Sequence, residues 1–211
     1  MDFKCDFTPG SWRQDDFLVT RSPRWDYSSS WVQKDDCITN SLPADMGSED
    51  ARTRRIGETY ISMLYKQPLC GNIQVETACS FAYRMAPLIV LSRELTPVLH
   101  EHLEIVLYDR GINIWHHFFN NNKPSWKLLA FQDIDLLPNQ QYRLIAELHC
   151  TKKGKFLYTG LNTTGFGCRL SDDWPDECYA GITACEGRNR FYNFAVSDIL
   201  PSDTMHERVS D

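Results

Sequence analysis

The sequence predicts an all-β protein, an antiparallel two-sheet β-sandwich formed by one domain. Apolar and polar residues alternate with a period of two along many segments, which is typical of half-buried strands. Turn-forming residues separate these segments at intervals of about 8–12 residues, the spacing found in sandwiches and barrels. The chain has 211 residues, which suits one domain of generous size.

The clearest alternation is in "NIQVETACSFAYR", residues 72–84, and "HLEIVLY", residues 102–108, alternates in the same way. Further predicted strands are, in order, 112–119, 125–132, 141–150, 155–161 and 190–196. Arg110-Gly111, "NNNKP", "LPNQ", "KKGK" and "TTGFG" supply the turns between them. The one helical element we expect is a short turn within 91–102, with which Pro97 interferes.

The remaining stretches are predicted to be irregular parts of a single domain that spans 1–211. Residues 43–58, "PADMGSEDARTRRIGE", are polar and mixed in charge, and we interpret them as a long surface loop. The tail after Leu200 is expected to fray.

Composition excludes some classes of partner and indicates a compartment. The net charge is −6, and no basic stripe is present, which argues against a nucleic-acid partner. The first residues form no apolar signal segment, and no run of about 18 apolar residues could cross a membrane. Without an export signal we expect a cytoplasmic location, in which the eight cysteines are reduced thiols. They contain no C-x-x-C pair, which argues against a zinc ribbon or a thioredoxin-like motif. The sequence does not decide whether edge strands pair two copies of the chain into a homodimer.

The stretch "HLEIVLYDRGINIWHHFF" is predicted to be a β-hairpin with Arg110-Gly111 as its loop. In that register Glu104 lies opposite His117, where side chains are about 4.5–5.5 Å apart at Cβ. Arg110 resists the positive φ that such a loop prefers, and a three-residue loop would instead set Glu104 against His116. In both registers Glu104 faces an imidazole, so the sequence predicts a carboxylate–histidine pair.

A carboxylate beside a histidine can fix the imidazole tautomer and support proton transfer near neutral pH. His102 and Tyr108 lie on the same predicted face, and we take Glu104, His117, His102 and Tyr108 as the candidate catalytic residues. Trp115 offers a flat surface on which a sugar ring can stack, and Asn113 can form hydrogen bonds with the hydroxyl groups of the sugar. Each of these residues taken alone is more often a structural feature of a sheet.

Charged residues elsewhere could complete a binding site if they converge on the same surface. Glu76 and Arg84 lie on the non-core face of 72–84. Glu186, Arg188 and Arg190 lie beside a glycine near the last strand. Arginine binds carboxylates in a bidentate fork, so these side chains would suit an acidic sugar. Solvated surface charges are the competing interpretation.

No metal ligand set and no cofactor are predicted. The hairpin offers imidazole and carboxylate donors, but alternation puts His116 and His117 on opposite faces. A histidine-bound metal and a structural calcium stay as alternatives. No nucleotide-binding fingerprint is present.

The meander ends in "GITACEGRNRFYNFAV", and this ending, above all "FYNFAV" at 191–196, resembles the concanavalin A-like jelly rolls. That superfamily includes galectin-like and laminin-G-like lectins, laminarinases and jelly-roll polysaccharide lyases. The resemblance covers about residues 15–198 and implies a curved sheet whose concave face binds sugar. The E-x-D-x-x-E motif of laminarinase-type hydrolases and the Gln-x-His motif of alginate-lyase-type jelly rolls are absent, so the resemblance implies no particular activity.

These observations lead to two hypotheses about function. The first is a cytoplasmic carbohydrate-active enzyme that binds a short saccharide or glycoside, acidic or neutral, and cleaves a glycosidic bond. Hydrolysis would pair Glu104 with Glu186 or Glu76; elimination would use His102 or His117 with Tyr108 as base and acid, and Arg84 or Arg190 as the stabilising cation. The histidine and tyrosine content favours elimination. The second hypothesis is a non-catalytic lectin-like module in which Trp115 stacks on the sugar.

Overall fold

The computed structural model describes residues 2–24, 29–41, 60–82, 85–108, 110–162 and 164–199. Within these residues the chain is a sandwich of two antiparallel sheets, so the all-β prediction is confirmed. The part of the chain that is described contains one 3-10 turn, Gln14–Asp16, and no helix long and apolar enough to cross a membrane. The predicted surface loop and the predicted C-terminal tail lie outside the described residues.

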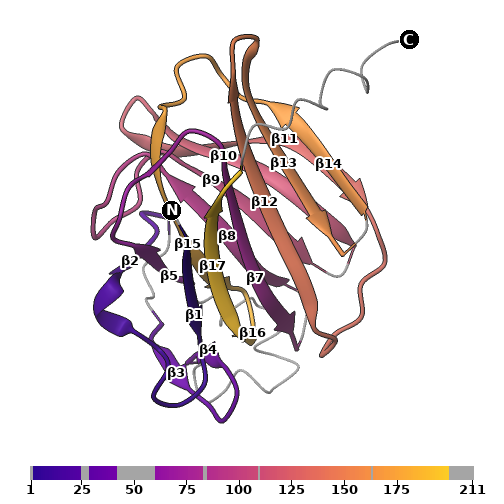
Figure 1. Cartoon of the computed structure of the whole chain (residues 1–211). Coiled ribbons are helices and arrows are strands. Elements are labelled where there is room, and N and C mark those ends of the chain that lie inside the picture. The colour runs from indigo at the N-terminus through magenta and orange to yellow at the C-terminus, as the bar shows by residue number, and fades with distance from the viewer. Residues whose placement is uncertain are drawn as a thin grey trace.

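The first sheet, which we call sheet A, has nine strands in the described residues, in the order β14-β13-β12-β7-β16-β4-β3, with β17 pairing β7 and β1 pairing β17. Its strands are β1 (Phe3–Asp6), β3 (Trp31–Gln33), β4 (Ile38–Asn40), β7 (Ile73–Phe81), β12 (Tyr142–Thr151), β13 (Gly154–Leu161), β14 (Thr164–Arg169), β16 (Asn189–Phe191) and β17 (Asn193–Asp198). Figure 1 shows β12, β13 and β14 at one side of this sheet.

The second sheet, sheet B, has eight strands in the described residues, in the order β11-β10-β9-β8-β15-β5-β2, with β6 pairing β15. Its strands are β2 (Phe17–Thr20), β5 (Tyr60–Tyr65), β6 (Leu69–Cys70), β8 (Met85–Ser92), β9 (His102–Tyr108), β10 (Gly111–Asn120), β11 (Lys123–Asp133) and β15 (Glu177–Cys185). Sheet B lies behind sheet A in Figure 1.

One continuous apolar core fills the space between the two sheets. Val75 and Leu144 of sheet A and Ile105, Ile114 and Ile182 of sheet B are all buried in it. Because side chains alternate along a strand, the residues next to these point to the outer face of their sheet. Glu104, next to Ile105, therefore lies on the outer face of sheet B.

A second, smaller apolar cluster covers part of this outer face. Its buried members are Tyr60, Leu64, Leu88, Val90, Leu99, Val106 and Cys185. Leu99 reaches it from the segment after β8, where the predicted helical turn is absent and the prediction was wrong. Backbone hydrogen bonds fasten this segment to Arg21, whose N–H donates to the carbonyl of Pro97 and whose carbonyl accepts from the N–H of Leu99. Sheet B is thus buried on both faces over its central strands.

Candidate functional site

The candidate site lies on the outer face of sheet B, where β9 and β10 form the predicted hairpin in a different register. Tyr108 pairs with Gly111, His102 with His117, and Glu104 with Trp115. Both predicted registers were therefore wrong. In the favoured one Glu104 pairs with His117, two residues beyond its observed partner Trp115. A shift of two keeps every side chain on its face, because side chains alternate with a period of two.

The backbone of Gly111 explains the register. Its φ is +140°, and a Cβ there would lie 1.9 Å from the carbonyl oxygen of Gln132 on the neighbouring strand β11. Only glycine fits at such a close approach between strands. Gly111 is therefore the first residue of β10 and not part of the turn.

The centre of the site is the carboxylate of Glu104, which contacts three polar side chains. The hydroxyl of Tyr60, on β5, donates to Oε1 at 2.6 Å. Nε2 of His102 lies 3.3 Å from Oε1, and Nε2 of His117 lies 3.0 Å from Oε2. His117 is the diagonal neighbour of Glu104, so the predicted Glu104–His117 contact is present although the two are not directly opposed. All four side chains are buried.

Burial and the imidazoles act in opposite directions on Glu104. Burial would raise the pKa of the carboxyl, but the charge of His117 and the hydrogen bonds from His102 and His117 outweigh it. The pKa of Glu104 is thereby held well below its usual range, so the carboxylate is ionised. Burial, then the charge of Glu104, raise the pKa of Tyr60 well above its usual range, so its hydroxyl stays protonated and donates.

The two histidines differ in what their second ring nitrogen does. Nδ1 of His102 lies 3.0 Å from the carbonyl oxygen of His100, which can only accept, so this nitrogen carries a proton. Both nitrogens of His102 are therefore engaged. Nδ1 of His117 has no hydrogen-bond partner among the described residues. His117 is thus the member of the cluster with an available nitrogen, and Glu104 orients it.

Exposed aromatic side chains lie beside this buried cluster. The outer-face rows that run from β9 across β10 to β11 are His102–His117–Trp126, Glu104–Trp115–Leu128 and Val106–Asn113–Phe131. Trp126, Leu128 and Phe131 are 51%, 43% and 46% exposed. We call these three side chains the β11 strip. They place an accessible apolar surface next to the acid–base cluster.

Two further predicted residues flank the strip. Asn113 is buried next to Phe131, and Trp115 is half-buried. Tyr108 is half-buried with its ring 6.2 Å from that of Phe131, and it pairs with Gly111. The hydroxyl at Glu104 is supplied by Tyr60 instead. No local pattern pointed to Tyr60, because it opens a strand without alternation.

The donor atoms of His102, Glu104 and His117 lie within 4.8 Å of one another, which raises the question of a metal. The two imidazole rings are stacked with their centroids 4.7 Å apart and their planes 11° from parallel. An imidazole binds a metal through a lone pair in its own ring plane, so one shared ion would have to lie in both planes. Stacked, nearly parallel planes offer no such point within bonding distance of both nitrogens. The residues as placed do not fit a metal held by both histidines.

Of the remaining predicted residues, Glu76 lies away from this surface. Glu76 lies on the outer face of sheet A, where it forms an ion pair with Arg143 at 2.5 Å. Glu186 lies in the turn after β15, with a φ of +48°. Arg84 lies outside the described residues.

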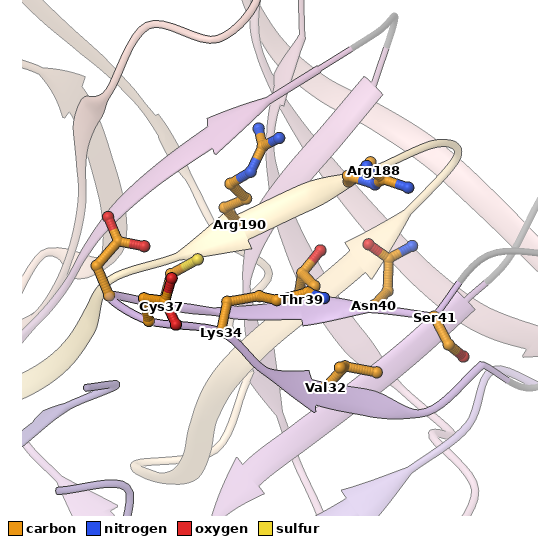
Figure 2. Close-up of a pocket in the computed structure, with 10 residues that line it drawn as sticks. Val32, Lys34, Cys37, Thr39, Asn40, Ser41, Arg188 and Arg190 are labelled. Carbon is orange, nitrogen blue, oxygen red and sulfur yellow. The ribbon is translucent and has the colours of Figure 1, made fainter. Parts of the chain in front are cut away.

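Arg188 and Arg190 line a different pocket, between β3, β4 and β16 of sheet A (Figure 2). Phe191 points into the core, so Arg190, its neighbour, points to the outer face of sheet A. The predicted convergence of these arginines with Glu104 was therefore wrong, because β16, which carries Arg190 and directly follows Arg188, belongs to the other sheet.

Comparison with known proteins gives the fold. No protein-family model matches the chain, and no curated protein matches its sequence. A Bacillus subtilis protein of unknown function with a galectin-like fold has a TM-score of 0.64 at 11% identity over 95% of this chain and 96% of its own. A carbohydrate-binding module, CBM66 from Bacillus subtilis, has a TM-score of 0.60 at 11% identity over 86% of this chain and 96% of its own.

A family 16 glycoside hydrolase, an endo-glucanase from Bacteroides ovatus, has a TM-score of 0.59 at 9% identity and covers 92% of this chain and 99% of its own. Identities this low show a shared fold and nothing finer. The two antiparallel sheets and these three similarities together establish that the chain has the concanavalin A-like jelly-roll fold.

Proposed function

We propose that the protein is a cytoplasmic carbohydrate-active enzyme that binds a short, acidic saccharide on the outer face of sheet B and cleaves a glycosidic bond by β-elimination. The observation that carries the proposal is the cross-strand row in which buried His117, oriented by Glu104, adjoins the exposed indole of Trp126. This row puts a proton-transfer group directly beside a surface for a sugar ring.

His117 is the proposed proton carrier. Glu104 accepts from Nε2 of His117, so in the neutral imidazole the lone pair lies on Nδ1, which can act as a base. Nδ1 takes the proton from the carbon α to the uronate carboxylate, and the electron pair of that C–H bond forms a C=C bond as the glycosidic C–O bond breaks. The imidazolium then returns the proton to the leaving oxygen. The ionised Glu104 stabilises the imidazolium between these two steps.

His102 and Tyr60 have positioning roles in this proposal. Their hydrogen bonds hold the carboxylate of Glu104 ionised and fixed toward His117. A base must lie within hydrogen-bond reach of its proton, so fixing the imidazole is part of catalysis.

The position of Glu76 favours elimination over hydrolysis. Hydrolysis requires two carboxyl groups about 5–5.5 Å or about 6.5–9.5 Å apart across the scissile bond. Glu76, one of the two candidate partners of Glu104, is on the outer face of the other sheet. In elimination, His117 both removes and returns the proton, so the reaction needs no second carboxyl group.

The β11 strip favours a second candidate function, a lectin-like module without catalysis. Trp126 is half exposed, and the guanidinium carbon of Arg24 lies 4.0 Å from its ring centroid. Aromatic surfaces flanked by polar groups bind sugars in proteins that perform no chemistry. The carbohydrate-binding module and the endo-glucanase with similar folds support both candidates equally.

The test is product analysis with the wild type and His117→Gln on uronate-containing and neutral oligosaccharides. Elimination creates an unsaturated product with new ultraviolet absorbance as well as a new reducing end, and hydrolysis creates only the reducing end. We expect the unsaturated product from a uronate substrate with the wild type, and binding without product with His117→Gln. Binding without any product in both proteins would establish the lectin-like function. No binding of any saccharide would overturn both candidates.

A further inference from the structure

The pocket between β3, β4 and β16 is a separate feature from the acid–base cluster. It has a volume of about 410 Å³ and is lined by Val32, Lys34, Asp35, Asp36, Cys37, Thr39, Asn40, Ser41, Arg188 and Arg190. Figure 2 shows Arg190, on β16, and Arg188, just before that strand, beside Thr39 and Asn40 of β4. Small-molecule sites are typically about 300–1,000 Å³, so the pocket can take a monosaccharide.

The backbone that carries the two arginines is fixed by buried polar side chains. The hydroxyl of Thr39 donates to the carbonyl of Asn189 at 2.7 Å, and the amide of Asn40 donates to the carbonyl of Gly187 at 2.7 Å. Oδ1 of Asn40 accepts from the N–H of Asn189 at 3.0 Å, and Oδ1 of Asn189 accepts from the N–H of Cys185 at 2.8 Å. Thr39, Asn40 and Asn189 are all buried. Such a network holds the base of a site in place before a ligand arrives.

Among the described residues, the cations of the pocket have no carboxylate partner. Lys34, Arg188 and Arg190 form no ion pair with any residue that the structure describes, although two aspartates line the same pocket. Arg190 donates to Oδ1 of Asn139 at a long 3.4 Å. Its cross-strand neighbours are Thr39 and Ser80, neither of which is charged. The two forks are therefore available for an oxyanion.

The two aspartates add a second kind of recognition. Asp35 and Asp36 lie in the exposed turn between β3 and β4. Burial, and then a hydrogen bond with Asp36, raise the pKa of Cys37 to about 11, so the thiol stays neutral and donates to Asp36. Carboxylates accept hydrogen bonds from sugar hydroxyls, whereas they repel a bare anion. Cations and acids in one pocket suit a ligand that carries both an oxyanion and hydroxyl groups.

We propose that this pocket binds an anionic sugar, with the oxyanion on Arg188 and Arg190 and hydroxyl groups on the aspartates. The oxyanion is a carboxylate in a uronate and a phosphate in a sugar phosphate. The site lies on the outer face of sheet A, so it does not depend on the reaction proposed for the outer face of sheet B.

The experiment is calorimetric titration of the full chain with glucuronate, glucose 6-phosphate, glucose and inorganic phosphate. We expect one or both anionic sugars to bind, more tightly than glucose or phosphate and more weakly at high salt. Arg188→Gln and Arg190→Gln should each weaken binding at least tenfold, and Arg190→Lys should recover only part of it, because lysine lacks the fork. The matched control is Arg169→Gln, which removes an exposed arginine of the same sheet that is paired with Asp172.

Three results would overturn the proposal: no binding of either anionic sugar, binding that the arginine variants leave unchanged, or phosphate binding as tight as that of glucose 6-phosphate. Melting curves should match the wild type for both arginine variants, because neither side chain forms an ion pair within the described part of the chain. Turnover at the outer face of sheet B should also be unchanged in them. A failure of this site is therefore distinguishable from a failure of the proposed function.

Discussion

Replacing Glu104 by glutamine should destabilise the protein by an amount that its contacts allow us to work out. The carboxylate accepts from Tyr60 at 2.6 Å and faces His117 at 3.0 Å and His102 at 3.3 Å. Hydrogen bonds to a charged group contribute about 1.5–3 kcal/mol, against about 1 kcal/mol for neutral ones. Glutamine keeps the bond from Tyr60 in neutral form and turns an amide N–H toward one imidazole. We expect the free energy of unfolding to fall by about 2–4 kcal/mol, near the range for breaking a buried ion pair.

Urea denaturation at neutral pH measures this loss, and a second glutamate–histidine pair provides the control. Oε2 of Glu147 lies 3.1 Å from Nε2 of His149, but the Glu147 side chain is 34% exposed. An exposed pair contributes at most about 1 kcal/mol, so Glu147→Gln should change the free energy of unfolding little. Equal stability of wild type and Glu104→Gln would refute our account of the cluster.

The loss should also depend on pH in one direction. The pKa of Glu104 is lowered in the folded state, so its stabilising contribution is complete above its unfolded value of 4.5. That contribution is lost as the pH falls through the lower, folded value. We therefore expect the difference between wild type and Glu104→Gln to be constant from neutral pH down to about pH 5 and to narrow only in stronger acid.

Three further substitutions test neighbouring parts of the account. Tyr60→Phe removes the hydroxyl group that donates a hydrogen bond to Glu104. Urea denaturation should show a free energy of unfolding lower by about 1–3 kcal/mol, and kcat should fall by a larger factor than KM rises. Trp126→Ala should weaken saccharide binding about two- to tenfold by calorimetry and leave the melting temperature close to wild type, since the side chain is half exposed. Gly111→Ala should cost about 2 kcal/mol or more, because its Cβ would meet the carbonyl oxygen of Gln132; a melting temperature equal to wild type would contradict the hairpin register.

The strands that the sequence predicts best are those with one face in the core and one less buried. In β7 the odd-numbered residues are all buried, and several even-numbered ones are half-buried, which produces a clear period of two. β5, with six buried residues in a row, has no alternation and was not predicted. β8 carries the apolar run "PLIV" and was missed for the same reason, because sheet B is covered on both faces.

The sequence predicts on which face of the sheet each site residue lies, but not which residues are its neighbours on adjacent strands. Alternation alone puts His102, Glu104 and His117 on one face, and any shift by two residues preserves this. The register depends on the contact of Gly111 with another strand, which no local pattern reveals. The contribution of Tyr60 depends on a strand that lies 44 residues away from Glu104 in the chain.

The misassigned arginines have a similar cause. "GRNR" precedes the last predicted strand, and the sequence cannot say to which sheet a strand belongs. Arg190 follows the crossover from β15 in sheet B to β16 in sheet A, which moves it to the opposite outer face from Glu104. Long-range topology, rather than local pattern, therefore decided which charged residues meet.

The measurement that tests the central claim most directly compares binding and turnover of one uronate-containing oligosaccharide by the wild type and Glu104→Gln. Both should be measured well below the melting temperature of the variant, so that only folded protein contributes. We predict similar dissociation constants for the two proteins and a loss of turnover of about 10²–10⁴-fold in the variant, the range for general acid–base catalysis. Turnover by Glu104→Gln at the wild-type rate would contradict the account.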